Sequence, residues 1–269
     1  MNSVAEISDA GSLKRGVLLL KLLATAGSRG LALTELTGKT GIPHPTVHRV
    51  LRQLLSEGLV QHSGETRRYR LGPLAFELGV ACSTMHDIRD VCQPQMESLA
   101  ETTGDTAYLV VRSGFEAVCM HRCEGSFPVR ALVLEIGSRR PLGVGAGGMA
   151  ILSAVGDDER HEIFNRIAAS LPAFGHLSVD EVETACLQAR ARGMSVIRNR
   201  VTLGIAAVGV PICNSFGQPI AALSVAALSQ RMTERKIAFT AESLKKAVKT
   251  VETKLRAAVG APVQLARST

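Results

Sequence analysis

The stretch that most constrains this chain runs from Leu33 to Gly58, where two short helical patterns flank a tight turn. Gly41 supplies the turn, and Pro45 suits the first position of the second helix, where its missing N–H costs nothing. Apolar residues then recur at helical spacing and predict a core-facing stripe of Val47, Val50, Leu51, Leu54 and Leu55. The pattern predicts a helix-turn-helix, although an ordinary pair of amphipathic helices would share this spacing.

The polar face of the second helix carries side chains that can contact bases and phosphates. The candidate DNA-binding residues on it are His44, Pro45, Thr46, His48, Arg49 and Arg52. A predicted β-hairpin follows, with strands at 59–62 and 67–71, and it adds Arg67, Arg68 and Arg70. Helices followed by a basic hairpin are typical of a winged helix, which predicts double-stranded operator DNA as the partner.

The formal net charge of +7 is concentrated near the N-terminus. Residues 1–75 contain ten Lys and Arg against five Asp and Glu, whereas residues 76–269 contain 21 against 19. A basic excess confined to the helix-turn-helix region favours nucleic acid over a generally basic surface.

The rest of the chain is long enough for a second domain, since 46% of its 269 residues are hydrophobic and can bury a second core. Mixed strands and helices predict an α+β domain with a largely antiparallel sheet. The expected strands lie at 106–112, 117–122, 129–136, 193–197, 205–213 and 220–228.

We expect four segments: a winged helix-turn-helix over 11–72, a linker helix over 73–86, a second domain over 87–259 and a tail over 260–269. In the linker, Leu74, Leu78 and Cys82 recur every fourth position and form an apolar stripe. The small first domain offers this stripe no obvious partner. Such a helix commonly links domains or pairs with its copy in a dimer.

Two features bear on the cellular compartment. The uncharged run from Val201 to Gln230 is interrupted by glycine and proline, so it lacks the roughly 20 continuous apolar residues of a membrane span. Six dispersed cysteines without a signal peptide indicate reduced thiols. We therefore expect a cytoplasmic protein with no membrane partner.

No motif predicts catalysis, a cofactor or a metal. Residues 143–148 match the dinucleotide pattern G-x-G-x-x-G, but no strand precedes them directly and no acidic residue follows at the required distance. Cys119, His121 and Cys123 would share one strand face, yet a fourth metal ligand is missing. An enzyme carrying a DNA-binding module, with its site at the glycine-rich loop, remains the alternative function.

Three stretches carry a family resemblance: IPHPTVHRVLRQL, IGSRRPLGVGAGGMAILSA and RGMSVIRNRVTLGIAAVGVPICNSFGQPIAALSVAALSQRMT. In order and spacing they resemble the IclR family of bacterial transcriptional regulators. The resemblance implies a winged helix-turn-helix, a linker helix and a GAF-like effector-binding domain. It also implies a repressor-type regulator of a catabolic operon that binds a palindromic operator as a homodimer or homotetramer.

The resemblance further implies an effector pocket, lined by Val129, Leu132, Arg140, Ala146, Gly147, Ile197, Ala207, Ser224 and Ala226. Small-acid-binding members have an acidic residue where this chain has Ile197, and a Ser-x-Ser pair where it has Ser224-Val225-Ala226. Both changes make the pocket less polar and argue against a glyoxylate-like effector. We expect a small organic acid with an aromatic or aliphatic body, its carboxylate held by Arg140 near a helix start.

Overall fold

The computed structural model describes residues 11–26, 29–81 and 83–260. The chain divides into two compact units, Met1–His86 and Asp87–Thr269. The predicted tail beyond residue 260 and the Cys82 position of the linker stripe lie outside the described residues. No helix in the described ranges is both long and apolar enough to cross a membrane.

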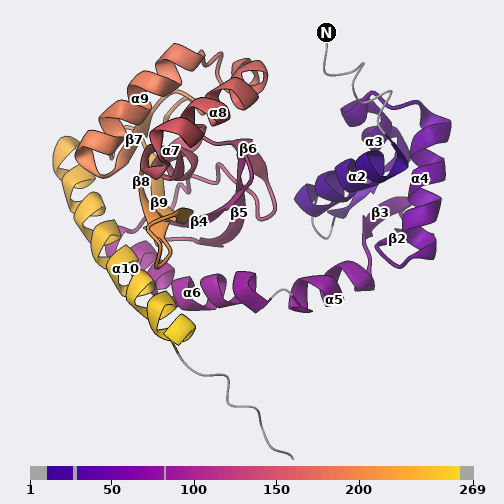
Figure 1. The fold of residues 1–269 in the computed structure, drawn as a ribbon, viewed down its shortest axis with the longest axis horizontal. Helices are drawn as coiled ribbons and strands as arrows, with labels where there is room; N and C mark the ends of the chain where they lie inside the picture. Colours follow the sequence, from indigo (N-terminus) through magenta and orange to yellow (C-terminus); the bar gives the residue numbers. More distant parts are fainter. Residues whose placement is uncertain (1–10, 27–28, 82, 261–269) are drawn as a thin grey trace, which may run out of the picture. The chain divides into compact units, whose positions relative to one another are not determined.

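The first unit is a small helical domain with a three-stranded antiparallel sheet (Figure 1). The sheet order is β1-β3-β2. The elements are α2 (Ser12–Ala26), β1 (Leu31–Ala32), α3 (Leu33–Thr40), α4 (His44–Ser56), β2 (Val60–Ser63) and β3 (Arg68–Leu71). Apolar side chains of the three helices meet in one core, which includes Leu19, Leu36 and Leu51.

Local interactions fix the two helices and the turn between them. The Glu35 carboxylate accepts a hydrogen bond from the Ala32 N–H (2.7 Å), which satisfies a donor at the start of α3. Gly41 ends α3 with a left-handed backbone (φ 67°), a conformation that glycine adopts without steric cost. Pro43 occupies the N-cap position of α4, the residue just before the helix begins at His44. Pro45 is therefore the second helical residue and not the first, the position predicted from the sequence.

Helix α5 (Pro73–Ala81) follows the hairpin, and α6 (Ser83–Thr103) begins at the end of the first unit and continues into the second. The second unit is built on a six-stranded, fully antiparallel sheet of order β6-β5-β4-β9-β8-β7. Its strands are β4 (Thr106–Ser113), β5 (Glu116–Cys123), β6 (Arg139–Pro141), β7 (Ser195–Arg198), β8 (Ile205–Cys213) and β9 (Pro219–Leu228). The predicted α+β class with an antiparallel sheet is confirmed.

Helices cover both faces of this sheet (Figure 1). Because side chains alternate along a strand, Leu109 packs with α6 and α10 (Glu234–Gly260). Its neighbours Tyr108 and Val110 pack with the helices of the other face. Those helices are α7 (Gly145–Ala154), α8 (Asp157–Ile167), the 3₁₀ helix η2 (Ala168–Ala173) and α9 (Val179–Arg192).

Two expectations about β5 and the segment after it are wrong. Residues 129–136 form no strand, and the edge of the sheet is the three-residue β6. A register shift in the β4–β5 pairing places Val110 opposite Cys119 but Leu109 opposite His121. Cys119 therefore faces α7. His121 and Cys123 lie on the opposite face of the sheet, with His121 Nε2 and Cys123 Sγ 3.6 Å apart, so two of the three residues share a face and Cys119 does not.

Candidate DNA-binding surface and ligand pocket

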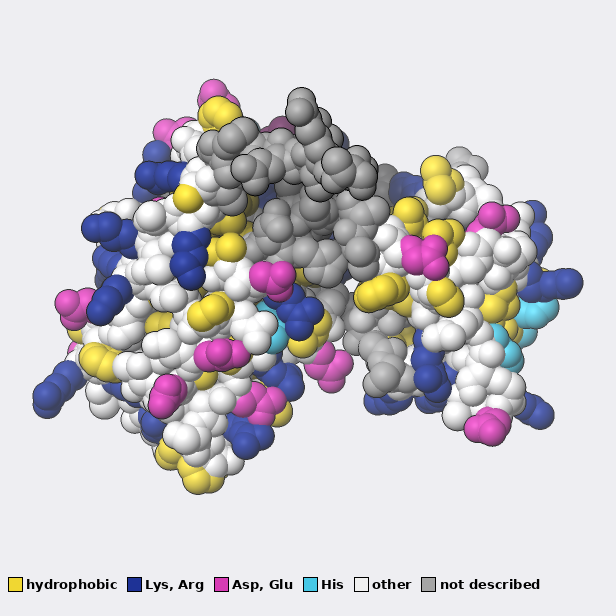
Figure 2. Space-filling view, turned by 90° about the horizontal axis from the view of Figure 1, so that it is seen from below, with side chains coloured by type: hydrophobic (Ala, Val, Ile, Leu, Met, Phe, Trp, Pro, Cys, Tyr) yellow, Lys and Arg dark blue, Asp and Glu magenta, His cyan; other side chains and the backbone are white. Residues whose placement is uncertain are grey.

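Helix α4 presents a polar face opposite its buried stripe. Val47, Val50 and Leu51 are buried, while His48, Arg49 and Arg52 are exposed on the other side. His44 and Pro45 are exposed at the start of the helix, and Thr46 is half-buried. Figure 2 shows Lys, Arg and His side chains close together along one side of this unit. The face is therefore free to contact a polyanion.

The three arginines of the hairpin differ in what they contact. Arg67 is exposed in the turn and forms no ion pair or hydrogen bond among the described residues. Arg68 pairs with Glu35 (3.1 Å) and donates to the Gly30 carbonyl (2.9 Å), so it joins the hairpin to α3 and to the start of β1. Arg70 is half-buried. Of the three arginines predicted to contact phosphate or the minor groove, Arg67 is the one that is exposed and has no partner among the described residues.

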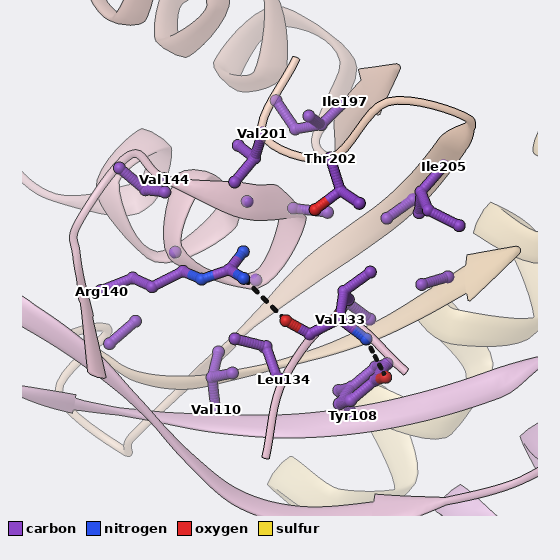
Figure 3. Close-up of a pocket in the computed structure, with 18 of the residues that line it drawn as sticks. Tyr108, Val110, Val133, Leu134, Arg140, Val144, Ile197, Val201, Thr202 and Ile205 are labelled. Carbon is purple, nitrogen blue, oxygen red and sulfur yellow. Dashed lines mark hydrogen bonds between the residues drawn. The ribbon is translucent and has the colours of Figure 1, made fainter. Parts of the chain in front are cut away.

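The second unit contains a pocket between the sheet and the start of α7 (Figure 3). Its walls leave about 620 Å³ empty, mouth included. The strands contribute Tyr108, Val110, Ile205, Ala207, Ser224 and Ala226. Val133 and Leu134 close one side, while Ile197, Arg200, Val201 and Thr202 close another. The lining is largely apolar and contains no Asp or Glu among the described residues.

Seven of the nine residues expected around an effector line this pocket: Arg140, Ala146, Gly147, Ile197, Ala207, Ser224 and Ala226. Val129 and Leu132 do not, because their side chains are 56% and 52% exposed. The segment that carries them is not a strand, and it directs Val133 and Leu134 into the pocket instead. Tyr108, a buried aromatic residue on β4, was missed because nothing in its local sequence distinguishes it from a core residue.

Arg140 is a charged group of this pocket that has no acidic partner among the described residues. Its guanidinium points into the pocket and donates from Nη2 to the Val133 carbonyl (2.7 Å) (Figure 3). Burial lowers the pKa of Arg140, because removal from water disfavours the charged form. No carboxylate of the described residues forms an ion pair with it, whereas the neighbouring Arg139 pairs with Glu116 (2.9 Å). Arg200, the second arginine in the lining, pairs with Glu181 (2.7 Å).

The start of α7 adds backbone donors to the same site. No side chain in the described part of the chain caps this helix, and Ala146, Gly147 and Gly148 in its first turn line the pocket. A Cβ on Gly147 would lie 2.5 Å from a Val110 methyl carbon, so glycine permits this close approach to the sheet. Ser195 Oγ donates to the Ala146 carbonyl (2.6 Å) and holds the helix start in place. Free N–H groups at a helix start favour a bound anion.

Other polar groups of the site suit binding better than catalysis. The Ser224 hydroxyl is inside the pocket and forms no hydrogen bond within the described part of the chain. The nearby strand β5 carries Cys119, which does not line the pocket; burial raises the pKa of its thiol to about 11 and keeps it protonated and unreactive near neutral pH. No group of three or more metal-binding side chains occurs among the described residues.

A winged helix-turn-helix on the same chain as an α+β domain with a pocket is the architecture of a DNA-binding transcriptional regulator with a separate regulatory domain. Comparison with known families agrees with this class. Residues 12–64 match the IclR helix-turn-helix domain, and residues 80–253 match the bacterial transcriptional regulator IclR C-terminal domain. The chain belongs to the IclR family.

Individual relatives cover nearly the whole chain. The HTH-type transcriptional regulator KipR of Bacillus subtilis is 30% identical, over 84% of this chain and 90% of its own length. The transcriptional repressor IclR of Escherichia coli is 26% identical, over 89% and 88% respectively. An IclR homolog from Microbacterium hydrocarbonoxydans, solved in complex with 4-hydroxybenzoate, has a TM-score of 0.70 at 23% identity, over 92% of this chain and 100% of its own. The curated relatives are transcriptional regulators, so this chain is a regulator and not an enzyme.

Proposed function

We propose that this protein is an effector-responsive regulator whose second unit binds a small organic acid with an aromatic or aliphatic body. Arg140 carries the proposal, because it is a largely buried cation that reaches into an apolar pocket and has no carboxylate partner among the described residues. Burying a charge without a partner is costly. A ligand carboxylate would supply the missing partner through charge-assisted hydrogen bonds.

The shape and polarity of the pocket support this ligand class. The pocket has mostly apolar walls with a few polar groups, the usual composition of a small-molecule site. Val110, Ile197 and Ile205 offer apolar contacts to a ring or short alkyl chain, and Ser224 offers one hydroxyl. A two- or three-carbon oxoacid would leave most of this apolar surface uncovered. The ligand of the Microbacterium homolog, 4-hydroxybenzoate, belongs to the proposed class.

For DNA, we propose that His44, Pro45, Thr46, His48, Arg49 and Arg52 face the major groove and that Arg67 contacts phosphate. The absence of competing ion pairs at Arg49, Arg52 and Arg67 within the described residues supports these roles. We further propose a palindromic operator of a catabolic operon, bound by a dimer or tetramer, because two-fold protein symmetry is matched by two-fold symmetry in DNA.

A thermal-shift series tests the effector. Benzoate, 4-hydroxybenzoate and cyclohexanecarboxylate should raise the melting temperature of the full-length protein, because a ligand that binds only the folded state stabilises it. Benzamide keeps the ring without the charge and should not, and glyoxylate should not. The Arg140→Gln variant should lose about 10- to 100-fold in affinity for the acids, the value of one to two charge-assisted hydrogen bonds.

Arg139→Gln is the matched control, since Arg139 is the adjacent residue on β6 but pairs with Glu116 outside the pocket. It should bind the acids as the wild type does. Equal stabilisation by benzoate and benzamide, or an unchanged response in Arg140→Gln, would overturn the proposal.

A further inference from the structure

Residues 129–137, here called the strap, lie beside the pocket without forming a strand. Side chains from the sheet hold its backbone polar groups. Tyr108 Oη donates to the Ala131 carbonyl (2.5 Å) and accepts from the Val133 N–H (3.1 Å). Arg140 Nη2 donates to the Val133 carbonyl (2.7 Å). Both backbone groups of Val133 are thus bound by side chains that line the pocket (Figure 3).

The strap connects the pocket with the surface. Val133 and Leu134 form part of the pocket wall. Val129, Leu132 and Ile136 lie on the outside and are each more than half exposed. At its C-terminal end the strap is attached to β5, where the Gly137 N–H donates to the Cys119 carbonyl (2.7 Å). A shift of the strap would therefore change the pocket wall and an exposed apolar surface together.

The Val133 carbonyl takes up an Arg140 Nη2 donor that an acid could also use. The carbonyl oxygen lies 2.7 Å from Nη2, which leaves no space for another atom between them. A carboxylate that binds the guanidinium through both terminal nitrogens competes with this carbonyl for Nη2. A carboxylate is also the stronger acceptor, because it is charged and the carbonyl is not.

We propose that Tyr108 and Arg140 latch the strap over the empty pocket, and that an organic acid binding Arg140 displaces the Val133 carbonyl and loosens the strap. The second half of this inference rests on the proposed function. The bonds from Tyr108 to the strap and the attachment at Gly137 remain, so the strap moves as a hinged segment and does not unfold. The strap is then the element that reports occupancy of the pocket at the protein surface.

Hydrogen exchange of the ligand-free, full-length protein tests the latch. Peptides covering residues 129–137 should exchange about five- to tenfold faster in Arg140→Gln and in Tyr108→Phe than in the wild type, the factor expected for one lost hydrogen bond. Tyr108→Phe keeps the ring and removes only the hydroxyl. Arg139→Gln is the control, because its side chain bonds Glu116 and Ser113 and not the strap. Strap exchange equal in Arg140→Gln, Tyr108→Phe and Arg139→Gln would overturn the latch.

Benzoate tests the displacement. In the wild type, benzoate at a concentration that raises the melting temperature should speed exchange in the strap, and in Arg140→Gln it should cause no further increase. Slower or unchanged strap exchange at that concentration would overturn the displacement. If benzoate leaves the melting temperature unchanged, the proposed aromatic-acid effector fails, and the ligand-free variants still decide whether the latch exists.

Discussion

Replacing Arg67 by Gln should reduce the salt dependence of DNA binding, whereas replacing Arg68 by Gln should not. Arg67 is exposed in the hairpin turn without a partner among the described residues, while Arg68 is held by Glu35 and by the Gly30 carbonyl. Each phosphate contact contributes about 0.9 to the slope of log affinity against log salt concentration. Over a rise from about 50 to 200 mM salt, loss of one contact therefore changes the fall in affinity by about 3.5-fold.

Fluorescence anisotropy with labelled duplex DNA at four salt concentrations measures this slope. Any duplex serves, because the phosphate contribution does not depend on sequence. Arg68→Gln should keep the wild-type slope but unfold more easily by about 1 to 2 kcal/mol, since it loses a half-exposed ion pair and one hydrogen bond. A changed slope in Arg68→Gln together with a wild-type slope in Arg67→Gln would refute this assignment of the hairpin arginines.

Three further predictions concern binding and stability. Arg49→Ala should weaken binding to a selected operator by about 1–3 kcal/mol, the contribution of one good base contact. The melting temperature should not change, because Arg49 is exposed opposite the buried stripe of α4. Unchanged operator affinity would show that Arg49 does not read a base. Asp105→Ala should lower the free energy of unfolding, measured in urea, by about 3 kcal/mol. Buried Asp105 pairs with Arg231 (2.5 Å) and Lys236 (3.2 Å), so its loss leaves two cations side by side. A change smaller than the error of the fitted free energy would contradict this. Burial raises the pKa of Cys92 to about 12 and that of Cys119 to about 11, so these thiols lose their protons in the unfolded chain at a lower pH than in the folded protein. The free energy of unfolding should therefore fall as the pH rises above the pKa of an unfolded cysteine, about 8.5. Cys92→Ala should flatten this decline, and an equally steep decline would exclude Cys92 as its source.

The helix-turn-helix could be predicted because local patterns determine it. The stripe of Val47, Val50 and Leu51 has the period of a helix, and Gly41 marks a turn that needs a left-handed backbone. The strands at 205–213 and 220–228 were also predictable, because continuous apolar runs bounded by turn residues are typical of buried strands. In each case the decisive residues are close in sequence.

The strap could not be predicted, because residues distant in sequence hold it. Its apolar composition resembles that of a strand. Besides a local bond to the Ala131 carbonyl, Val133 has hydrogen bonds to Tyr108, 25 residues earlier, and to Arg140, seven residues later. The role of Arg68 was hidden for the same reason, since Glu35 lies 33 positions away. A local pattern shows which groups need partners and does not show which distant side chain supplies them.

The exposed arginines of the first unit and the largely buried Arg140 of the second predict different dependences of binding affinity on salt. Arg49, Arg52 and Arg67 are exposed. When such side chains neutralise DNA phosphates, the salt cations bound to the DNA are released, so DNA affinity should fall steeply as the salt concentration rises. Arg140 is largely removed from water, where screening is weak, so the affinity for benzoate should change less than about twofold between roughly 50 and 200 mM salt. Calorimetric titration with benzoate, beside the anisotropy measurement on the same protein, compares the two. A benzoate affinity that falls as steeply as DNA affinity would mean that the acid binds exposed cations, and it would remove Arg140 as the anchor of the effector.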